Sequence, residues 1–167
     1  MLGEPALAEI GWTGTMAGAE SVRVSEVVLR PCTVVDAEAV ERLRVSGWKA
    51  AYRGLVPDSF LDGMPADVER RRQLMASRGG QVTETVAVSG ADVVGWIVAG
   101  PCRDADRTYP WQGEIYGCYV LPGWWGNGIG RRLLDHTAST FQEGGRVDLS
   151  LWVLEGNVRA RRFYESC

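Results

Sequence analysis

Apolar and polar residues follow different periods along this chain, and each period predicts an element. Residues 1–24 show little periodicity and are rich in Gly, Ala and Glu. We therefore expect a flexible N-terminal tail there, with folded sequence from residue 25 onward. The apolar run 27–29 predicts a short strand that Pro31 closes.

Two helices are expected next, because apolar residues recur three and four positions apart. The first begins behind Thr33 and Asp36, which form a capping-box pattern, and runs as far as Gly54. The second covers 65–76. We expect its three arginines, 70–72, to lie mostly on the solvated face.

From residue 82 the period changes to that of strands, and Gly-rich turns separate the elements. The predicted elements are strands at 82–88, 93–99, 114–121 and 147–153 and helices at 128–142 and 156–164. Strands follow one another in the middle of the chain instead of alternating with helices. This order predicts a single mixed α/β (α+β) domain over 25–167 and not a strictly parallel sheet.

A glycine-rich turn joins the third of these strands to the next helix, and such turns bind anions. Gly126, Gly128 and Gly130 let the backbone approach a ligand, and the first amides of the helix have no partner within it. Arg131 and Arg132 add charge beside them. The same residues also suit a tight turn without a ligand, and both interpretations stay open here. A dinucleotide fingerprint fits poorly, because Arg131 occupies its third glycine position.

Composition narrows the class of protein. The chain has 167 residues, 46% of them apolar and 23% charged, which is typical of a globular domain. Its net charge of -3 predicts no attraction to nucleic acid or to an anionic membrane. No apolar run is long enough for a membrane span, and the N-terminal stretch lacks the basic start of a secretion signal. Four cysteines without paired spacing fit a reducing compartment, so we expect a cytoplasmic protein.

Two scarce residue types exclude whole classes of site. Lys49 is the only lysine and lies in no phosphate-binding loop of the Walker type. His136 is the only histidine, so a metal site built on several histidines is excluded and no metal is expected. Catalysis is therefore expected to use carboxylates, tyrosine and backbone dipoles.

The stretch 114–135 closely resembles the acetyl-CoA motif of the GNAT N-acetyltransferase superfamily. That motif has the pattern [Gln/Arg]-x-x-Gly-x-[Gly/Ala] after a strand ending in Val-x-Pro. Val120 and Pro122 match the strand end, and Gly128 and Gly130 match the glycines. Trp125 stands where the family usually has Gln or Arg.

A second motif matches independently and in the right order. Residues 157–164 resemble the Asn-x-x-Ala-x-x-Phe-Tyr segment of the superfamily, and 48–57 resembles a segment of many small members. The resemblance covers 27–167. It implies a central mixed, mostly antiparallel sheet flanked by helices.

The resemblance also implies an activity, which is transfer of an acetyl group from acetyl-CoA to a primary amine of a small molecule or peptide by direct attack. The backbone amide near Val120 would polarise the thioester, Tyr164 would protonate the departing thiolate, and Asn157 would bind the pantetheine arm. The residues placed on the cofactor are Cys118, Tyr119, Val120, Trp125, Gly126, Asn127, Gly128, Ile129, Gly130, Arg131 and Asn157.

The base and the acceptor pocket are assigned from the residues themselves. Glu114, at the start of the central strand, is our candidate for a base acting through water, although it also suits a solvated strand end. Glu84 and Asp148 are weaker candidates. Trp48 and Tyr52 lie four positions apart on one helical face and could form a wall of the acceptor pocket, or simply pack in the core.

Two alternatives to an enzyme stay open, namely a non-catalytic acyl-CoA-binding or regulatory module and a dinucleotide-binding fragment. The chain also stops at Cys167, where the superfamily continues into further strands. We therefore expect a C-terminally incomplete domain with strand 147–153 at an open sheet edge. Either the chain is a truncated form of a longer protein, or a partner subunit, as in a homodimer, covers that edge. The N-terminal tail could also fold over it, although its composition does not favour a strand.

Overall fold

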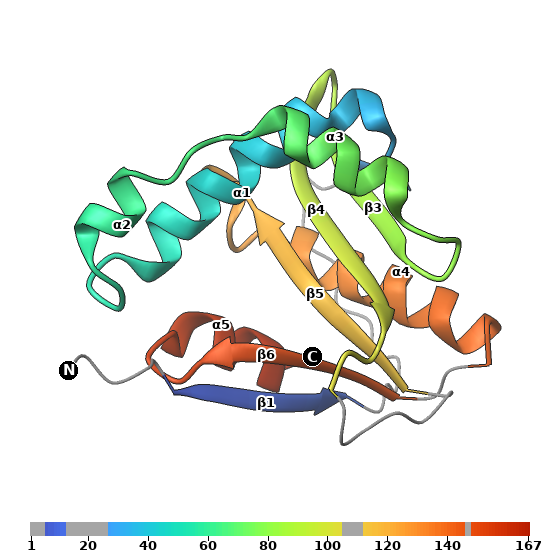
Figure 1. Ribbon diagram of the computed structural model, residues 1–167. Coiled ribbons are helices and arrows are strands. Elements are labelled where there is room, and N and C mark those ends of the chain that lie inside the picture. The colour runs from blue at the N-terminus through green and yellow to red at the C-terminus, as the bar shows by residue number, and fades with distance from the viewer. Residues whose placement is uncertain (1–5, 13–26, 105–111, 146–147) are drawn as a thin grey trace.

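A computed structural model describes residues 6–12, 27–104, 112–145 and 148–167 (Figure 1). Strands and helices follow one another in the order that the sequence predicts, with a strand added before them and a short helix added between the first two helices. The elements are β1 (Leu7–Trp12), β2 (Val27–Pro31), η2 (Val34–Asp36), α1 (Ala37–Tyr52), α2 (Asp58–Asp62), α3 (Val68–Ser77), β3 (Thr83–Ser89), β4 (Asp92–Pro101), β5 (Gln112–Val120), η4 (Pro122–Trp124), α4 (Ile129–Glu143), β6 (Asp148–Leu154) and α5 (Val158–Glu165).

The six strands form one mixed sheet in the order β1-β6-β5-β4-β3-β2. Every neighbouring pair is antiparallel except β5 and β6, which run parallel. The predicted fold class, a mostly antiparallel mixed sheet flanked by helices, is therefore confirmed.

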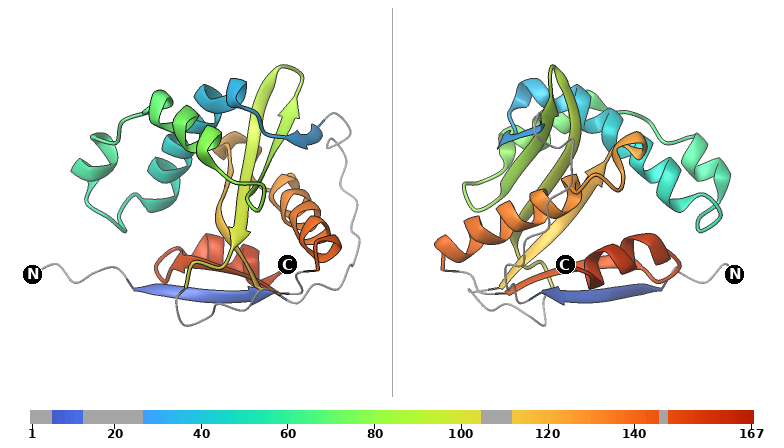
Figure 2. Two further views of the ribbon diagram at one scale, coloured as in Figure 1. Left: turned by 45° about the vertical axis from the view of Figure 1, so that its right-hand side comes forward. Right: turned by 180° about the vertical axis from the view of Figure 1, so that it is seen from behind.

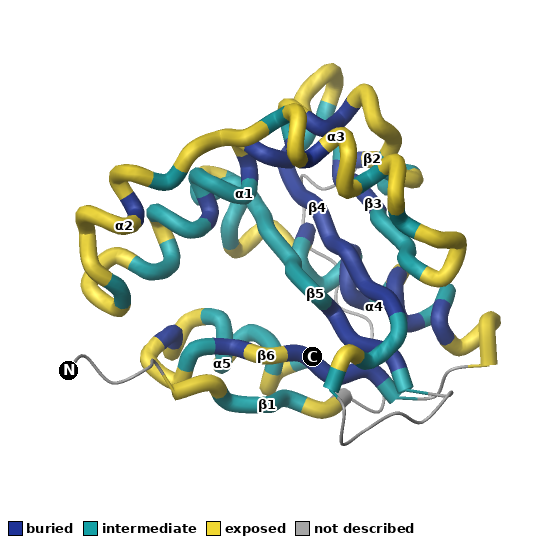
Figure 3. The backbone as a smooth tube through the Cα atoms, viewed as in Figure 1, coloured by how far each residue is buried: buried dark blue, intermediate teal, exposed yellow. Residues whose placement is uncertain are grey.

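Helices cover both faces of the sheet (Figure 2). Helices α1 and α3 lie on one face and α4 on the other, with α5 packed beside α4 against β6. Each face has its own apolar cluster, since Val40 and Leu43 of α1 meet Trp96, whereas Ile129 and Leu133 of α4 meet Ile97. Because both faces are covered, β4 is buried along most of its length, whereas β5 is fully buried only at residues 113–115 (Figure 3).

The turn into α1 has the polar anchor that its sequence predicts. The Asp36 carboxylate accepts hydrogen bonds from the backbone N–H of Thr33 at 2.8 Å and from its hydroxyl at 3.0 Å. The guanidinium of Arg30 on β2 donates two more, at 2.7 and 2.8 Å. This guanidinium lowers the pKa of Asp36 to about 2. One buried carboxylate thus joins the edge strand to the first helix.

The N-terminal segment requires a correction. Residues 7–12 lie in the expected tail, yet they form β1. The whole length of β1 pairs antiparallel with β6. The physical reason is a short alternation in which Ala8 and Ile10 pack against the core of the α4 face. Strand β6 is therefore flanked on both sides, by β5 and by β1, and is not an open edge. Residues 1–5 and 13–24 of the expected tail lie outside the described part of the chain.

The arginines of α3 require a second correction. Arg70 and Arg72 are exposed as expected, but Arg71 is only 8% exposed. Its guanidinium pairs at 2.9 Å with the buried carboxylate of Glu41 on α1, to which Arg44 also donates. The helices α1 and α3 are therefore joined by a buried ion pair.

Candidate active site

The sheet opens between β5 and β6. The two strands pair only from Gln112 to Ile115 on β5 and from Asp148 to Leu151 on β6. Beyond these residues the strands diverge, so the backbone edge of β5 from Tyr116 to Val120 has no strand beside it there. A cavity of about 870 Å³ lies at this opening, with α1 and α2 on one side and α5 and β6 on the other.

The cavity collects the residues that the sequence motifs single out. Among the predicted cofactor residues, every one except Asn127 lines it, and so do Trp48, Tyr52 and Tyr164. Asn127 lies exposed on the turn, with its side-chain amide 3.5 Å from the carbonyl of Trp125. Segments more than 100 residues apart in the sequence thus meet at one site.

Two glycines of the turn adopt backbone angles that other residues avoid. Gly126 has a φ of +80° and Gly128 one of +74°, and the space where a Cβ would stand is open at both. Gly128 is the N-cap of α4, so the first amides of this helix point into the turn without intrahelical partners. Gly130 has a different role, because a Cβ there would stand 2.8 Å from the Phe163 ring of α5. The turn therefore presents free amides beside open space, and the last glycine lets the two helices pack closely.

Trp125 forms two contacts beside this turn. Its indole N–H donates a hydrogen bond of 2.7 Å to the carbonyl oxygen of Val120. The guanidinium of Arg159, from the first turn of α5, stacks 3.9 Å from the centre of the ring. No carboxylate in the described part of the chain pairs with Arg159, which also lines the cavity. A cation held by a tryptophan therefore stands next to the turn.

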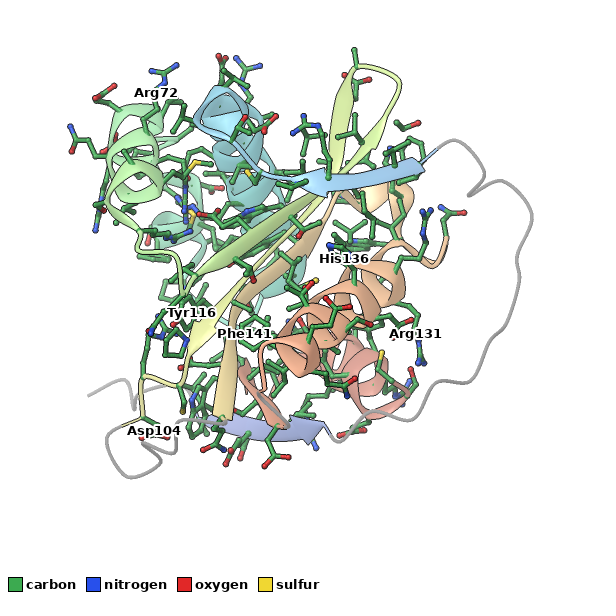
Figure 4. All side chains as sticks on the ribbon, turned by 90° about the vertical axis from the view of Figure 1, so that its right-hand side faces the viewer. Arg72, Asp104, Tyr116, Arg131, His136 and Phe141 are labelled. Atoms are coloured by element: carbon green, nitrogen blue, oxygen red, sulfur yellow. The ribbon has the colours of Figure 1, made fainter. Side chains whose placement is uncertain are left out.

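Arg131 is held by the end of the chain. Its guanidinium donates to the carbonyl oxygens of Ser166 and Cys167, the latter at 3.2 Å (Figure 4). Arg132, the other arginine expected beside the turn, donates at 2.9 Å to the carbonyl of Val27 and does not line the cavity. Of the two arginines that line the cavity, Arg159 is the one whose hydrogen-bond donors face no described partner.

Tyr164 and Cys118 lie deep in the cavity. Burial raises the pKa of Tyr164 well above its ordinary value, and neighbouring Cys118 acts in the same direction. Burial likewise raises the pKa of Cys118 to about 12, so its thiol stays protonated. The Tyr164 hydroxyl has no hydrogen-bond partner among the described residues. The Tyr164 side chain is therefore a neutral phenol.

Asn157 begins α5 as its N-cap. Its side-chain oxygen accepts a hydrogen bond of 3.1 Å from the backbone N–H of Ala160. The residue caps the helix and is buried, and it also lines the cavity. Burial raises the pKa of nearby Tyr52, and a hydrogen bond with Asn157 opposes this shift.

Aromatic side chains form the wall on the α1 and α2 side. The rings of Trp48 and Tyr52 meet edge to face, with centroids 4.7 Å apart, and Phe60 of α2 lies 6.3 Å from Trp48. The indole N–H of Trp48 donates to the Tyr119 hydroxyl at 3.0 Å. The Tyr119 ring in turn stacks on Trp96. These contacts fix the wall in position.

Glu114 does not fit the role of base, and the structure corrects this assignment. Its carboxylate is buried and accepts hydrogen bonds from the backbone N–H of Arg103 at 2.9 Å and from the Arg103 guanidinium at 2.5 Å. It does not line the cavity. Glu84, a weaker candidate, accepts a hydrogen bond of 2.9 Å from the Trp96 indole and forms an ion pair with Arg78. Neither Glu84 nor Asp148 lines the cavity.

The described residues contain no cluster of His, Cys, Asp and Glu that could hold a metal ion. His136 is exposed on α4 and does not line the cavity. Within the described ranges, no helix combines the length and the apolar character that crossing a membrane requires.

Several lining residues escaped the sequence analysis. They are Leu7, Phe60, Tyr116, Trp152 and Arg159. For Arg159 a signal existed, because it lies two positions after Asn157 in the second motif. For Leu7 no signal existed, since it reaches the cavity only through the pairing of β1 with β6.

Comparison with known proteins finds a family model and relatives that are all acetyltransferases. The model of the acetyltransferase (GNAT) family matches residues 48–167. An uncharacterized N-acetyltransferase of Archaeoglobus fulgidus is 44% identical over 116 residues, which are 70% of this chain and 77% of that protein. An uncharacterized N-acetyltransferase of Bacillus subtilis is 26% identical over 132 residues, 78% of this chain and 73% of that protein.

Solved structures share the fold. The PaiA N-acetyltransferase of Thermoplasma acidophilum, crystallised in complex with coenzyme A, superposes with a TM-score of 0.73. The two chains are 16% identical, and the match covers 84% of this chain and 87% of that one.

Proposed function

Since the chain belongs to the acetyltransferase (GNAT) family, we propose that it transfers an acetyl group from acetyl-CoA to a primary amine. The observation that carries the proposal is the opening between β5 and β6. It places a glycine turn, an unpaired strand edge and the Tyr164 hydroxyl around one cavity.

The residues present fit the parts of acetyl-CoA. The amides at the start of α4 and the open space above Gly126 and Gly128 suit the diphosphate. Arg159 supplies the positive charge that the turn itself lacks at Trp125. The free edge of β5 from Cys118 to Val120 suits the amide groups of the pantetheine arm.

Val120 provides the polarising group. Its carbonyl oxygen faces the opening, where the Trp125 indole binds it. In an extended strand the N–H and C=O of one residue point to the same side, so the Val120 N–H also faces the opening. A backbone donor fixed in this way stabilises negative charge on an acyl oxygen.

The thioester supplies the acetyl group. The electron pair of the amine nitrogen forms the new N–C bond, and the electrons of the C–S bond leave with sulfur. Tyr164 gives its proton to that sulfur and recovers one that the nitrogen releases through water. With Glu114 occupied by Arg103, no carboxylate of the described lining takes the amine proton. The amine must therefore react from its neutral form.

Calorimetry and thiol release test the proposal. Wild-type protein should bind acetyl-CoA and release free thiol when an amine is added. Gly128→Glu should abolish binding, because a side chain and a negative charge would enter the diphosphate site. The positive φ of Gly128 is also unfavourable for a residue with a side chain. Unchanged affinity in this variant would refute the site. Binding without thiol release for any amine would favour the alternative of a non-catalytic acyl-CoA-binding module.

A further inference from the structure

The mouth of the cavity exposes apolar side chains from three different elements. Phe60 of α2 is 56% exposed, Trp152 of β6 is 44% exposed and Leu7 of β1 is 53% exposed, and all three line the cavity. Large apolar groups gathered at a concave mouth are typical of a site that receives an apolar ligand. Together with Trp48 and Tyr52 they give both walls of the acceptor side an apolar surface.

Negative charge is missing from the same walls. The described lining residues include no Asp or Glu, and the charged residues among them are Arg131 and Arg159. The carboxylates that flank Phe60, those of Asp58 and Asp62, are both paired with Arg53.

Two further carboxylates lie near this side of the sheet. Glu114 is paired with Arg103. Glu9, opposite Trp152 in the strand register, does not line the cavity and has a partner of its own. No described residue that lines the site is therefore a carboxylate that could pair with a cationic acceptor.

We infer that the acceptor is a monoamine with an aromatic or apolar body, and this inference rests on the proposed acetyl transfer. Such an amine buries its body against Phe60, Trp152 and Leu7 and keeps one nitrogen for the reaction. A polyamine or an aminoglycoside carries additional ammonium groups. Each would lose its water without a carboxylate partner among the described lining residues, which is unfavourable.

A panel of amines at saturating acetyl-CoA tests the inference by the rate of thiol release. We expect kcat/KM for 2-phenylethylamine and tryptamine to exceed that for spermidine and kanamycin at least tenfold. Equal or better turnover of spermidine or kanamycin would overturn the inference and leave the proposed function intact. Failure of acetyl-CoA to bind would refute both.

Substitution at the mouth gives a second test. Phe60→Ala and Trp152→Ala should each raise KM for 2-phenylethylamine roughly tenfold, as expected for lost apolar contact with a substrate. KM for acetyl-CoA should stay unchanged. The matched control is Val35→Ala, which removes an 85% exposed apolar side chain that does not line the cavity. Parallel loss of turnover for every amine in the panel, or no loss in either variant, would overturn the assignment of this wall.

Discussion

The hydroxyl of Tyr164 faces the cavity without a described partner, and burial keeps it protonated. Tyr164→Phe removes only this hydroxyl. We expect kcat to fall roughly 10²–10⁴-fold, the range for a lost general acid, with the calorimetric affinity for acetyl-CoA unchanged. Steady-state thiol release measures the first quantity. Equal kcat in both proteins would show that Tyr164 is a packing residue of α5.

Arg159 lines the cavity, but the motif comparison gave it no role in binding. Arg159→Gln keeps a polar side chain but removes the charge stacked on Trp125. A hydrogen bond to a charged group contributes about 1.5–3 kcal/mol, so affinity for acetyl-CoA should fall about tenfold or more. Affinity for acetyl-pantetheine, which has no diphosphate, should not change. Calorimetry with both ligands measures the difference.

The matched control for this experiment is Arg162→Gln. Arg162 lies on the same helix, is exposed and does not line the cavity. The Arg162→Gln variant should bind acetyl-CoA with the affinity of the wild type. If both variants lose the same affinity, the effect comes from overall charge and not from the contact with Trp125.

Glu114 shows where sequence reasoning fails at this scale. Its position at the start of the strand could be predicted, but its partner could not. Arg103 lies 11 residues earlier, after β4, in a loop whose sequence has no periodicity. The same limit applies to Arg71. The helical period of α3 cannot show that Arg71 pairs with Glu41, which lies 30 residues away on another helix. A motif gives the position of a residue in the sequence, but it does not identify the charged residue that the side chain contacts in the folded protein.

The junction of β2 and α1 depends on one carboxylate, which allows a test at the scale of elements. Asp36→Asn keeps the shape but weakens four hydrogen bonds, two of them from Arg30. Because Arg30 is partly exposed, we expect a loss of about 1–2 kcal/mol in the free energy of unfolding at pH 7. Urea denaturation measures it.

The same junction predicts a dependence on pH. The pKa of Asp36 is lowered from 3.8 to about 2, so its contribution is complete above pH 4 and is lost as the pH falls toward 2. The difference between wild type and Asp36→Asn should shrink over that interval. As control, Glu38→Gln removes an exposed ion pair with Arg42 and should change stability little. A difference that stays constant down to pH 2 would contradict the assignment.

Elements with local signals were predicted well. The capping pair at Thr33 and Asp36 and the glycine turn before α4 involve residues close together in the chain, and both are present. The opening between β5 and β6 is a different matter, because it depends on a register between distant strands. It could be expected only from resemblance to a family.

The whole sheet depends on a strand that the sequence did not reveal. Strand β1 is six residues long, and its partner β6 lies more than 130 residues further along the chain. Its alternation of Ala8 and Ile10 with Glu9 is too short to stand out from a Gly-rich and Ala-rich background. Pairing over such a distance is decided by the free edge of β6, which exists only once the rest of the sheet has formed.

Removal of residues 1–25 tests the role of β1 in the whole molecule. The edge of β6 would then be unpaired, and the core of the α4 face would lose Ala8 and Ile10. Lost packing of roughly 2–3 kcal/mol corresponds to a fall in Tm of about 5–10 °C for a chain of this size, and the open edge should cause association. Calorimetric melting and light scattering measure the two effects. Removal of residues 1–5 alone leaves β1 intact and should change neither. If the chain that begins at residue 26 has the same Tm and the same light scattering as the full chain, β1 does not close the sheet.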